Sequence, residues 1–167
     1  RSGRVDVMVA MNAETYRKDH AEVAAGGYLI YDSTWPRSQL FNRADIHILG
    51  VPLSRICNEN FAQARSRILM KNIMYVGVLA ALLDLDMNVI KQLLNEQFAA
   101  KAALLDANQK AIDLGHAYAK EHFSCPLPFR ARTLDKTRDH IMIDGNTTAG
   151  LGCLFAGATV GAWYPIT

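Results

Sequence analysis

The feature that most constrains this chain is an uncharged run at its carboxyl end, from Gly145 to Thr167, with the sequence GNTTAGLGCLFAGATVGAWYPIT. A bilayer is crossed by about 20 apolar residues, and Gly157 and Gly161 have the GxxxG spacing used between membrane helices. However, the glycines weaken a helix, Asn146 and the threonines lower its hydrophobicity, and no basic flank or aromatic belt marks both ends. The run is therefore better explained as the opening of a buried α/β unit than as a membrane span.

The uncharged run divides into a helix and a strand. Thr147 or Thr148 can cap a short helix that extends to about Ala158. Val160 to Tyr164 has the pattern of a buried strand, which Pro165 closes because proline cannot continue a central sheet. Ligands commonly bind in α/β folds just beyond the carboxyl end of a strand. We therefore expect a substrate-binding edge made by Tyr164, Pro165, Ile166 and Thr167.

Earlier in the chain, short apolar runs alternate with a helical pattern. Val5 to Met11 is a nearly continuous apolar run, typical of a strand covered on both faces in a parallel sheet. Asn12 is predicted to cap a helix from Ala13 to about Val23, and Gly26-Gly27 to end it. Two further strands are predicted at Tyr28 to Tyr31 and at Ile46 to Val51.

The second half of the chain is predicted to be helical. Ser54 can cap a helix from about Arg55 to Leu83, with a possible break near Met70. Asp86 can cap a helix in which Ile90, Leu94 and Phe98 are one turn apart, and the last long helix spans about Ala102 to His122. The fold class is therefore α/β, with a mainly parallel sheet flanked by helices, a helix-rich second half, and then the first helix–strand unit of a second α/β domain.

Prolines and charged residues separate the two parts. Cys125-Pro126-Leu127-Pro128 breaks the helical pattern and a charged stretch follows. We predict a first α/β domain over residues 1–124, a linker over 125–140, and the start of a second domain over 141–167.

Charge and cysteine spacing exclude several classes of function. The net charge of +2, from 18 basic and 16 acidic residues, does not favour nucleic acid as a partner. Cys57, Cys125 and Cys153 are far apart, so they indicate reduced thiols in a cytoplasmic protein and neither a disulfide framework nor a metal or iron–sulfur motif. The histidines form no HxxxH or HExxH pair, so no metal site is predicted.

Few residues carry a pattern typical of catalysis. Cys57 is expected to be a small buried helix residue, and Asp84 and Asp86 to be capping residues between two helices. Lys71 and Asn72 are expected to be solvated where a helix begins or ends. Thr167 is the candidate catalytic residue, since its hydroxyl can donate to a substrate carboxylate or carbonyl. The alternative role for Thr167, as the N-cap of a following helix, stays open.

These residues also resemble a known family. The Gly-Asn opening, the small-residue helix with Leu-Gly and Ala-Gly, and the ending Tyr-Pro-Ile-Thr resemble the start of the pyrimidine-binding domain in the α subunit of 2-oxoacid:ferredoxin oxidoreductases. Residues 4–122 look like the γ domain that precedes it in the two-subunit members. The version Ala162-Trp163-Tyr164 is most similar to members that use 2-oxoglutarate.

The resemblance implies an enzyme that oxidatively decarboxylates a 2-oxoacid with coenzyme A, giving acyl-CoA, carbon dioxide and reduced ferredoxin. It implies a β subunit that carries thiamine diphosphate with magnesium and a [4Fe–4S] cluster, and a dimer of αβ units. It also implies that the threonine matching Thr167 lies beside the thiazolium and holds the 2-oxoacid. This chain alone would then be inactive. The alternative from another class is a non-catalytic α/β interaction domain whose apolar tail packs against a partner subunit.

Overall fold

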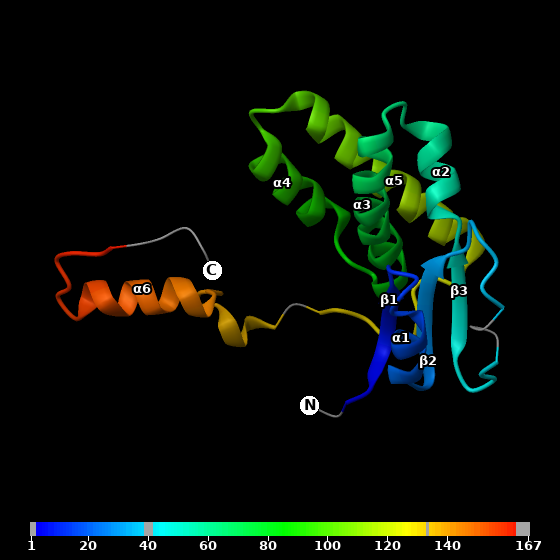
Figure 1. The fold of residues 1–167 in the computed structure, drawn as a ribbon, viewed down its shortest axis with the longest axis horizontal. Helices are drawn as coiled ribbons and strands as arrows, with labels where there is room; N and C mark the ends of the chain where they lie inside the picture. Colours follow the sequence, from blue (N-terminus) through cyan, green and yellow to red (C-terminus); the bar gives the residue numbers. More distant parts are fainter. Residues whose placement is uncertain (1–2, 39–41, 133, 163–167) are drawn as a thin grey trace. The chain divides into compact units, whose positions relative to one another are not determined.

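The structure is a computed structural model that describes residues 3–38, 42–132 and 134–162. The chain forms two compact units, Arg1–Ala131 and Arg132–Thr167. Figure 1 shows the first unit as a small sheet with a group of helices and the second as a helix with extended flanks.

The first unit contains a three-stranded parallel sheet. Its strands are β1 (Val5–Ala10), β2 (Val23–Asp32) and β3 (His47–Val51), in the order β1-β2-β3. Both pairs are parallel, with Val9 opposite Ile30 and Ile30 opposite Leu49. The predicted parallel β–α–β arrangement is confirmed, with helix α1 (Tyr16–Glu22) between the first two strands.

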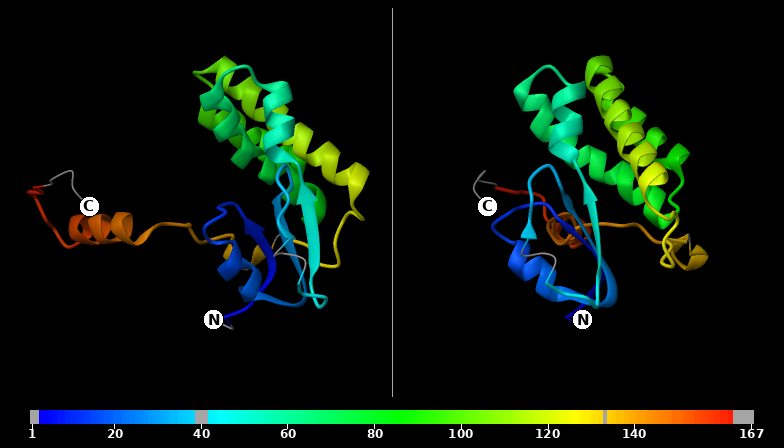
Figure 2. Two further views of the ribbon diagram at one scale, coloured as in Figure 1. Left: turned by 45° about the vertical axis from the view of Figure 1, so that its right-hand side comes forward. Right: turned by 90° about the vertical axis from the view of Figure 1, so that its right-hand side faces the viewer.

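The two faces of the sheet pack against different helices. On one face, Ala10, Leu29 and Tyr31 form a small cluster with Tyr16 of α1. On the other face, Ile30 and the end of β3 join a larger core with helices α2 (Leu53–Asn60), α3 (Ala64–Leu83) and α5 (Ala102–His122). Figures 1 and 2 show these helices, together with α4 (Met87–Phe98), gathered toward the carboxyl ends of the strands.

Helix α1 is shorter than the sequence predicts. The Asn12 side chain accepts a hydrogen bond from the Glu14 N–H (3.1 Å) and its carbonyl accepts one from the Thr15 N–H (3.1 Å), which makes a turn ahead of the helix. Because this turn occupies residues 12–15, the helix begins at Tyr16 and the prediction that Asn12 caps it is wrong.

Gly26 and Gly27 lie inside β2 and do not end the helix as predicted. Gly26 has a φ of +76°, and the register between β1 and β2 shifts between Val5 and Val7. A side chain at Gly27 would crowd the carbonyl oxygens of Asp6 and Ala24 at 2.9 Å. The glycine pair therefore makes an irregularity in the strand, where the neighbouring backbone comes close.

The predicted helix from Arg55 to Leu83 is divided into α2 and α3, and the break lies at residues 61–63, ahead of Met70. The Arg67 guanidinium donates to the carbonyls of Phe61 (2.7 Å) and Ala62 (3.0 Å), which have no helical partner at the break. Ser54 lies in the first turn of α2, so it is not the N-cap; that position belongs to Pro52.

The later helices agree with the sequence. Helix α4 is capped by Asp86, whose side chain accepts from the Asn88 N–H (2.8 Å), and α5 has the predicted bounds. The segment after α5 differs, because residues 125–131 belong to the first unit and not to a free linker. Leu127 is 4% exposed and its N–H donates to the Leu82 carbonyl at 2.8 Å.

Helices α3 and α5 cross at two glycines. A methyl group on Gly77 would overlap the carbonyl oxygen of Ile112, and one on Gly115 would overlap that of Met74. The two backbones are therefore in direct contact at the centre of the core. Both helices contribute fully buried side chains around this point, including Met74 and Ile112.

The second unit contains helix α6 (Gly145–Phe155). Its N-cap is Asp144, and not Thr147 or Thr148 as predicted; the Asp144 carboxylate accepts from the Thr147 N–H (2.9 Å) and hydroxyl (2.6 Å). These hydrogen bonds hold the pKa of Asp144 below its usual range.

The described part of the predicted strand, residues 160–162, is not in a strand, and Val160 is 86% exposed. A buried strand needs hydrogen-bonding neighbours, and the described residues of the second unit include none.

Among the described residues, α3 is the one helix long and apolar enough to cross a bilayer by length and composition. Core helices of globular proteins have the same length and composition, and α3 packs against α5 and α2 in the core.

We expect Gly77→Ala and Gly115→Ala each to lower the free energy of unfolding by about 3 kcal/mol, since the added methyl group forces the helix backbones apart. Chemical denaturation measures the change. Asn72→Ala, on the exposed face of α3, is the control and should change the free energy of unfolding by less than about 0.5 kcal/mol. Wild-type stability of both glycine variants would contradict the close crossing.

Candidate functional site

Polar side chains gather at the carboxyl ends of the three strands. Asp32 is the last residue of β2 and is only 6% exposed. At the end of β1, the Ala10 carbonyl accepts a hydrogen bond from the buried Tyr75 hydroxyl of α3 at 3.2 Å. The carboxyl edge of a parallel sheet is where open α/β folds bind ligands, so this edge is the first candidate site.

The Asp32 carboxylate accepts hydrogen bonds from four donor groups. Ser54 donates its N–H (3.2 and 3.3 Å to the two oxygens) and its hydroxyl (2.5 Å). Thr34 donates its N–H (3.1 Å) and its hydroxyl (2.6 Å). The Asp32 side chain therefore caps the N-terminus of α2 although it belongs to another part of the chain. It occupies the position at which a helix N-terminus otherwise attracts an external anion.

Lys71 completes this group, which we call the Asp32 cluster (Asp32, Thr34, Ser54 and Lys71). Its Nζ lies 3.9 Å from Asp32 Oδ2 and its side chain is 30% exposed. The prediction of a solvated charge at a helix terminus is wrong for Lys71, because α3 begins at Ala64 and Lys71 lies within it. Since Asp32 already has strong partners, the ammonium group keeps hydrogen-bonding capacity for a ligand.

A cavity of about 220 Å³ opens beside the cluster. Among the described residues, the basic side chains that line it are Arg67 and Lys71, and no Asp or Glu is in the lining. The remaining lining residues are Trp35, Ser54, Cys57, Asn58 and Ile68. Its size and charge suit a small anionic group such as a carboxylate or phosphate.

Cys57 lies against the cavity but is not suited to nucleophilic chemistry. It is 1% exposed, and burial, with a smaller contribution from the Asp32 charge, raises its thiol pKa to about 11. A thiol in this state is almost fully protonated near neutral pH. The prediction that Cys57 is a buried helix residue is confirmed, and the cavity is better suited to binding than to acid–base or covalent catalysis.

The described residues also contain no group of three His, Cys, Asp or Glu side chains that could hold a metal ion. Cys57 and Cys125 belong to the first unit and Cys153 to the second. A [4Fe–4S] cluster or a magnesium ion therefore finds no matching ligand set in the part of the chain that the structure describes.

The sequence contains a signal for the Asp32 cluster at the ends of two predicted strands. Asp32-Ser33-Thr34 follows one predicted strand, and Ser54 lies just after Pro52, which closes the next. Because parallel neighbours bring their carboxyl ends to the same edge, these groups can meet there. Lys71 had no such signal, since its place depends on where α3 lies relative to the carboxyl edge of the sheet.

The sequence-predicted site residues Tyr164, Pro165, Ile166 and Thr167 lie outside the described residues, so their role stays a prediction.

Comparison with known proteins connects the chain to one family. Residues 1–118 match the model of the family described as POR, pyruvate ferredoxin/flavodoxin oxidoreductase. A curated relative, ketoisovalerate oxidoreductase subunit VorA of Methanothermobacter thermautotrophicus, is 28% identical over 118 residues, which are 70% of this chain and 23% of VorA.

Two solved structures have similar folds. The 2-oxoglutarate:ferredoxin oxidoreductase from Magnetococcus marinus, with 2-oxoglutarate, coenzyme A and succinyl-CoA bound, has a TM-score of 0.78 and 26% identity, covering 94% of this chain and 27% of its own. The γ subunit of a keto/oxoacid ferredoxin oxidoreductase from Geobacter sulfurreducens has a TM-score of 0.55 and 18% identity, covering 72% and 68%. This chain thus spans about a quarter of VorA and of the Magnetococcus chain.

We expect Asp32→Ala to lower the free energy of unfolding by about 3 kcal/mol, because the buried donors of Ser54 and Thr34 lose their acceptor. Lys71→Gln should cost less than about 1 kcal/mol, since the Lys71 side chain is partly exposed and the four donors remain. Urea denaturation of the two variants checks the order, and a larger loss for Lys71→Gln would contradict the assignment of Asp32 as the internal cap.

We expect a thiol reagent at pH 8 to modify Cys153 rapidly and Cys57 only after unfolding, because Cys153 is exposed and burial raises the pKa of the Cys57 thiol. Mass spectrometry of the labelled peptides identifies each site. If Cys57 in the native protein is modified as fast as Cys153, the thiol of Cys57 is open to solvent and the assignment of a buried thiol is wrong.

Proposed function

Because the chain belongs to the pyruvate ferredoxin/flavodoxin oxidoreductase family, we propose that it is part of the α subunit of a 2-oxoacid:ferredoxin oxidoreductase. In the proposed reaction the 2-oxoacid loses carbon dioxide, its acyl group joins the sulfur of coenzyme A, and the two electrons released reduce ferredoxin, with a proton set free.

The single observation that carries the proposal is the similarity to the 2-oxoglutarate:ferredoxin oxidoreductase of Magnetococcus marinus over 94% of this chain, at a TM-score of 0.78. The first unit ends at Ala131, so a match of that extent includes part of the second unit. This supports the proposal that a γ domain is fused here to the start of a pyrimidine-binding domain.

For the substrate we propose 2-oxoglutarate. The Magnetococcus enzyme carries 2-oxoglutarate in its name, and Ala162-Trp163-Tyr164 resembles the version of the motif in such enzymes. The name of VorA specifies ketoisovalerate, which is the alternative substrate, but VorA matches a shorter part of the chain.

The cofactors are proposed to belong to a partner. The resemblance to the family supports placing thiamine diphosphate and [4Fe–4S] in a β subunit, and the described residues of this chain contain no group of His, Cys, Asp or Glu that could hold a metal ion. When bound, thiamine diphosphate would supply a carbanion for addition to the 2-oxoacid. In this chain, Thr167 is proposed to donate a hydrogen bond from its hydroxyl to the substrate carboxylate or carbonyl, with Tyr164, Pro165 and Ile166 beside it. The complete enzyme is proposed to be a cytoplasmic dimer of αβ units that reduces ferredoxin.

A non-catalytic interaction domain is the second candidate. One observation favours it: α6 has no buried residue, and Leu151, Leu154 and Phe155 are exposed by 38%, 67% and 89%. Such an apolar helix is suited to pack against a partner subunit. The same surface serves assembly if the enzyme proposal is right, so activity distinguishes the two candidates.

We expect the native complex isolated through this chain to reduce a viologen dye when 2-oxoglutarate and coenzyme A are both present. We expect no reduction when either compound is left out, and none when this chain alone replaces the complex. Ketoisovalerate and pyruvate are the matched controls for the substrate. Faster reduction with either control would keep the enzyme class and reject 2-oxoglutarate. If a complex that retains thiamine and iron fails to reduce the dye with any 2-oxoacid, the enzyme proposal is rejected and the non-catalytic interaction domain is favoured.

A further inference from the structure

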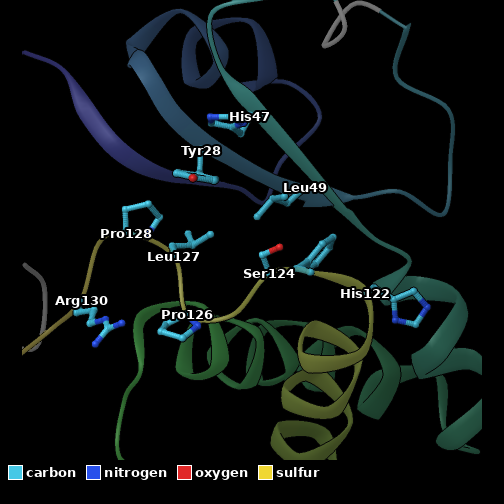
Figure 3. A pocket seen from close by; sticks show the side chains of 10 residues that line it. Tyr28, His47, Leu49, His122, Ser124, Pro126, Leu127, Pro128 and Arg130 are labelled. Atoms are coloured by element: carbon cyan, nitrogen blue, oxygen red, sulfur yellow. The ribbon is translucent and has the colours of Figure 1, made fainter.

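A second hollow lies on the first unit, on the helix-facing side of the sheet and toward the amino ends of the strands. It is a groove of about 630 Å³ between β2 and β3 on one side and the segment that follows α5 on the other (Figure 3). This volume is within the range of small-molecule sites, about 300–1,000 Å³. The residues that line it are Tyr28, His47, Leu49, His122, Phe123, Ser124, Pro126, Leu127, Pro128 and Arg130.

Aromatic rings cover the sheet side of the groove. Tyr28 of β2 and His47 of β3 are register partners, and their rings stack with centroids 4.7 Å apart and an interplanar angle of 21°. Phe129 meets the Tyr28 ring edge-on, at 5.9 Å and 86°. Flat rings at the mouth of an apolar groove suit a planar ligand, which can stack on them.

The opposite wall is fixed by the core. The Leu127 N–H donates to the Leu82 carbonyl (2.8 Å) and the Ala131 N–H donates to the Leu83 carbonyl (3.2 Å), both at the end of α3. Leu127 is buried, and Pro126 and Pro128 restrict the backbone on either side of it. The groove is therefore preformed, and a ligand does not have to order its wall.

Arg130 lines the groove at one end and His122 lines it at the other (Figure 3). The His122 ring stacks on Tyr118 with centroids 4.0 Å apart, and its Nδ1 lies 3.9 Å from Glu121 Oε2. None of the described Asp or Glu residues lines the groove. Within the described residues Arg130 makes no salt bridge, so its guanidinium can bind an anionic ligand group.

We propose that this groove binds a nucleotide, with the base stacked at the Tyr28–His47 pair and the phosphate bound by Arg130. A purely apolar ligand would leave the Arg130 charge without a partner, and a simple inorganic anion would leave the aromatic and apolar lining unused. A nucleotide combines a planar ring with an anion and fits both parts of the groove.

The proposed ligand is a free nucleotide, and this proposal is independent of the proposed function. The test uses binding alone and needs no turnover, so its failure is separate from a failure of the oxidoreductase proposal.

The experiment follows the five histidine ring signals of the full chain by ¹H–¹³C NMR during titration with ADP. We expect the signals of His47 and His122 to shift and those of His20, His116 and His140, which do not line the groove, to stay in place. Adenosine and ribose 5-phosphate each provide half of the ligand and should bind at least about tenfold more weakly than ADP. Coenzyme A should bind no more tightly than ADP, and tighter binding of coenzyme A would overturn the assignment of a free nucleotide.

Arg130→Gln should weaken ADP binding about tenfold and leave adenosine binding unchanged, and His47→Ala should weaken both. Arg132→Gln, which removes the same charge two residues later and outside the groove lining, is the control and should bind ADP like the wild type. The proposal is overturned if ADP shifts neither groove histidine, or if ADP binds equally well to Arg130→Gln and to the wild type.

Discussion

The first unit depends on the contact between the backbones of α3 and α5. At Gly77 and Gly115 the two helices approach so closely that neither position has room for a methyl group. The fully buried side chains Met74 and Ile112 lie beside this contact. Since the sheet packs against the same core, the positions of Ile30 and of the end of β3 depend on the distance between the two helices.

Local patterns predicted much of this fold. The strands were found because buried parallel strands are continuous apolar runs, and α4 and α5 because a capping Asp86 and a regular apolar spacing are contained within each helix. Errors arose where one segment determines the structure of another. The break before α3 depends on Arg67 reaching back to Phe61, and the conformation at Gly26-Gly27 depends on the neighbouring strand β1.

The candidate site was harder to predict for the same reason. Asp32 and Ser54 are hydrogen-bonded although 22 residues separate them, and Lys71 meets Asp32 because α3 lies at the carboxyl edge of the sheet. No periodic pattern contains that information. The terminal strand was predicted from its composition, but a strand also needs neighbours to pair with, and the described part of the second unit contains no strand.

The internal cap at Asp32 also affects how a ligand can bind at the carboxyl edge of the sheet. In many α/β proteins the helix N-terminus at this edge is completed by a ligand phosphate, so that the loop becomes ordered when the ligand arrives. Here a carboxylate of the protein itself holds the start of α2 and the turn at Thr34. The start of α2 and the turn at Thr34 are thus organised by the protein itself, and a ligand that binds or leaves at this edge does not have to fold or unfold them.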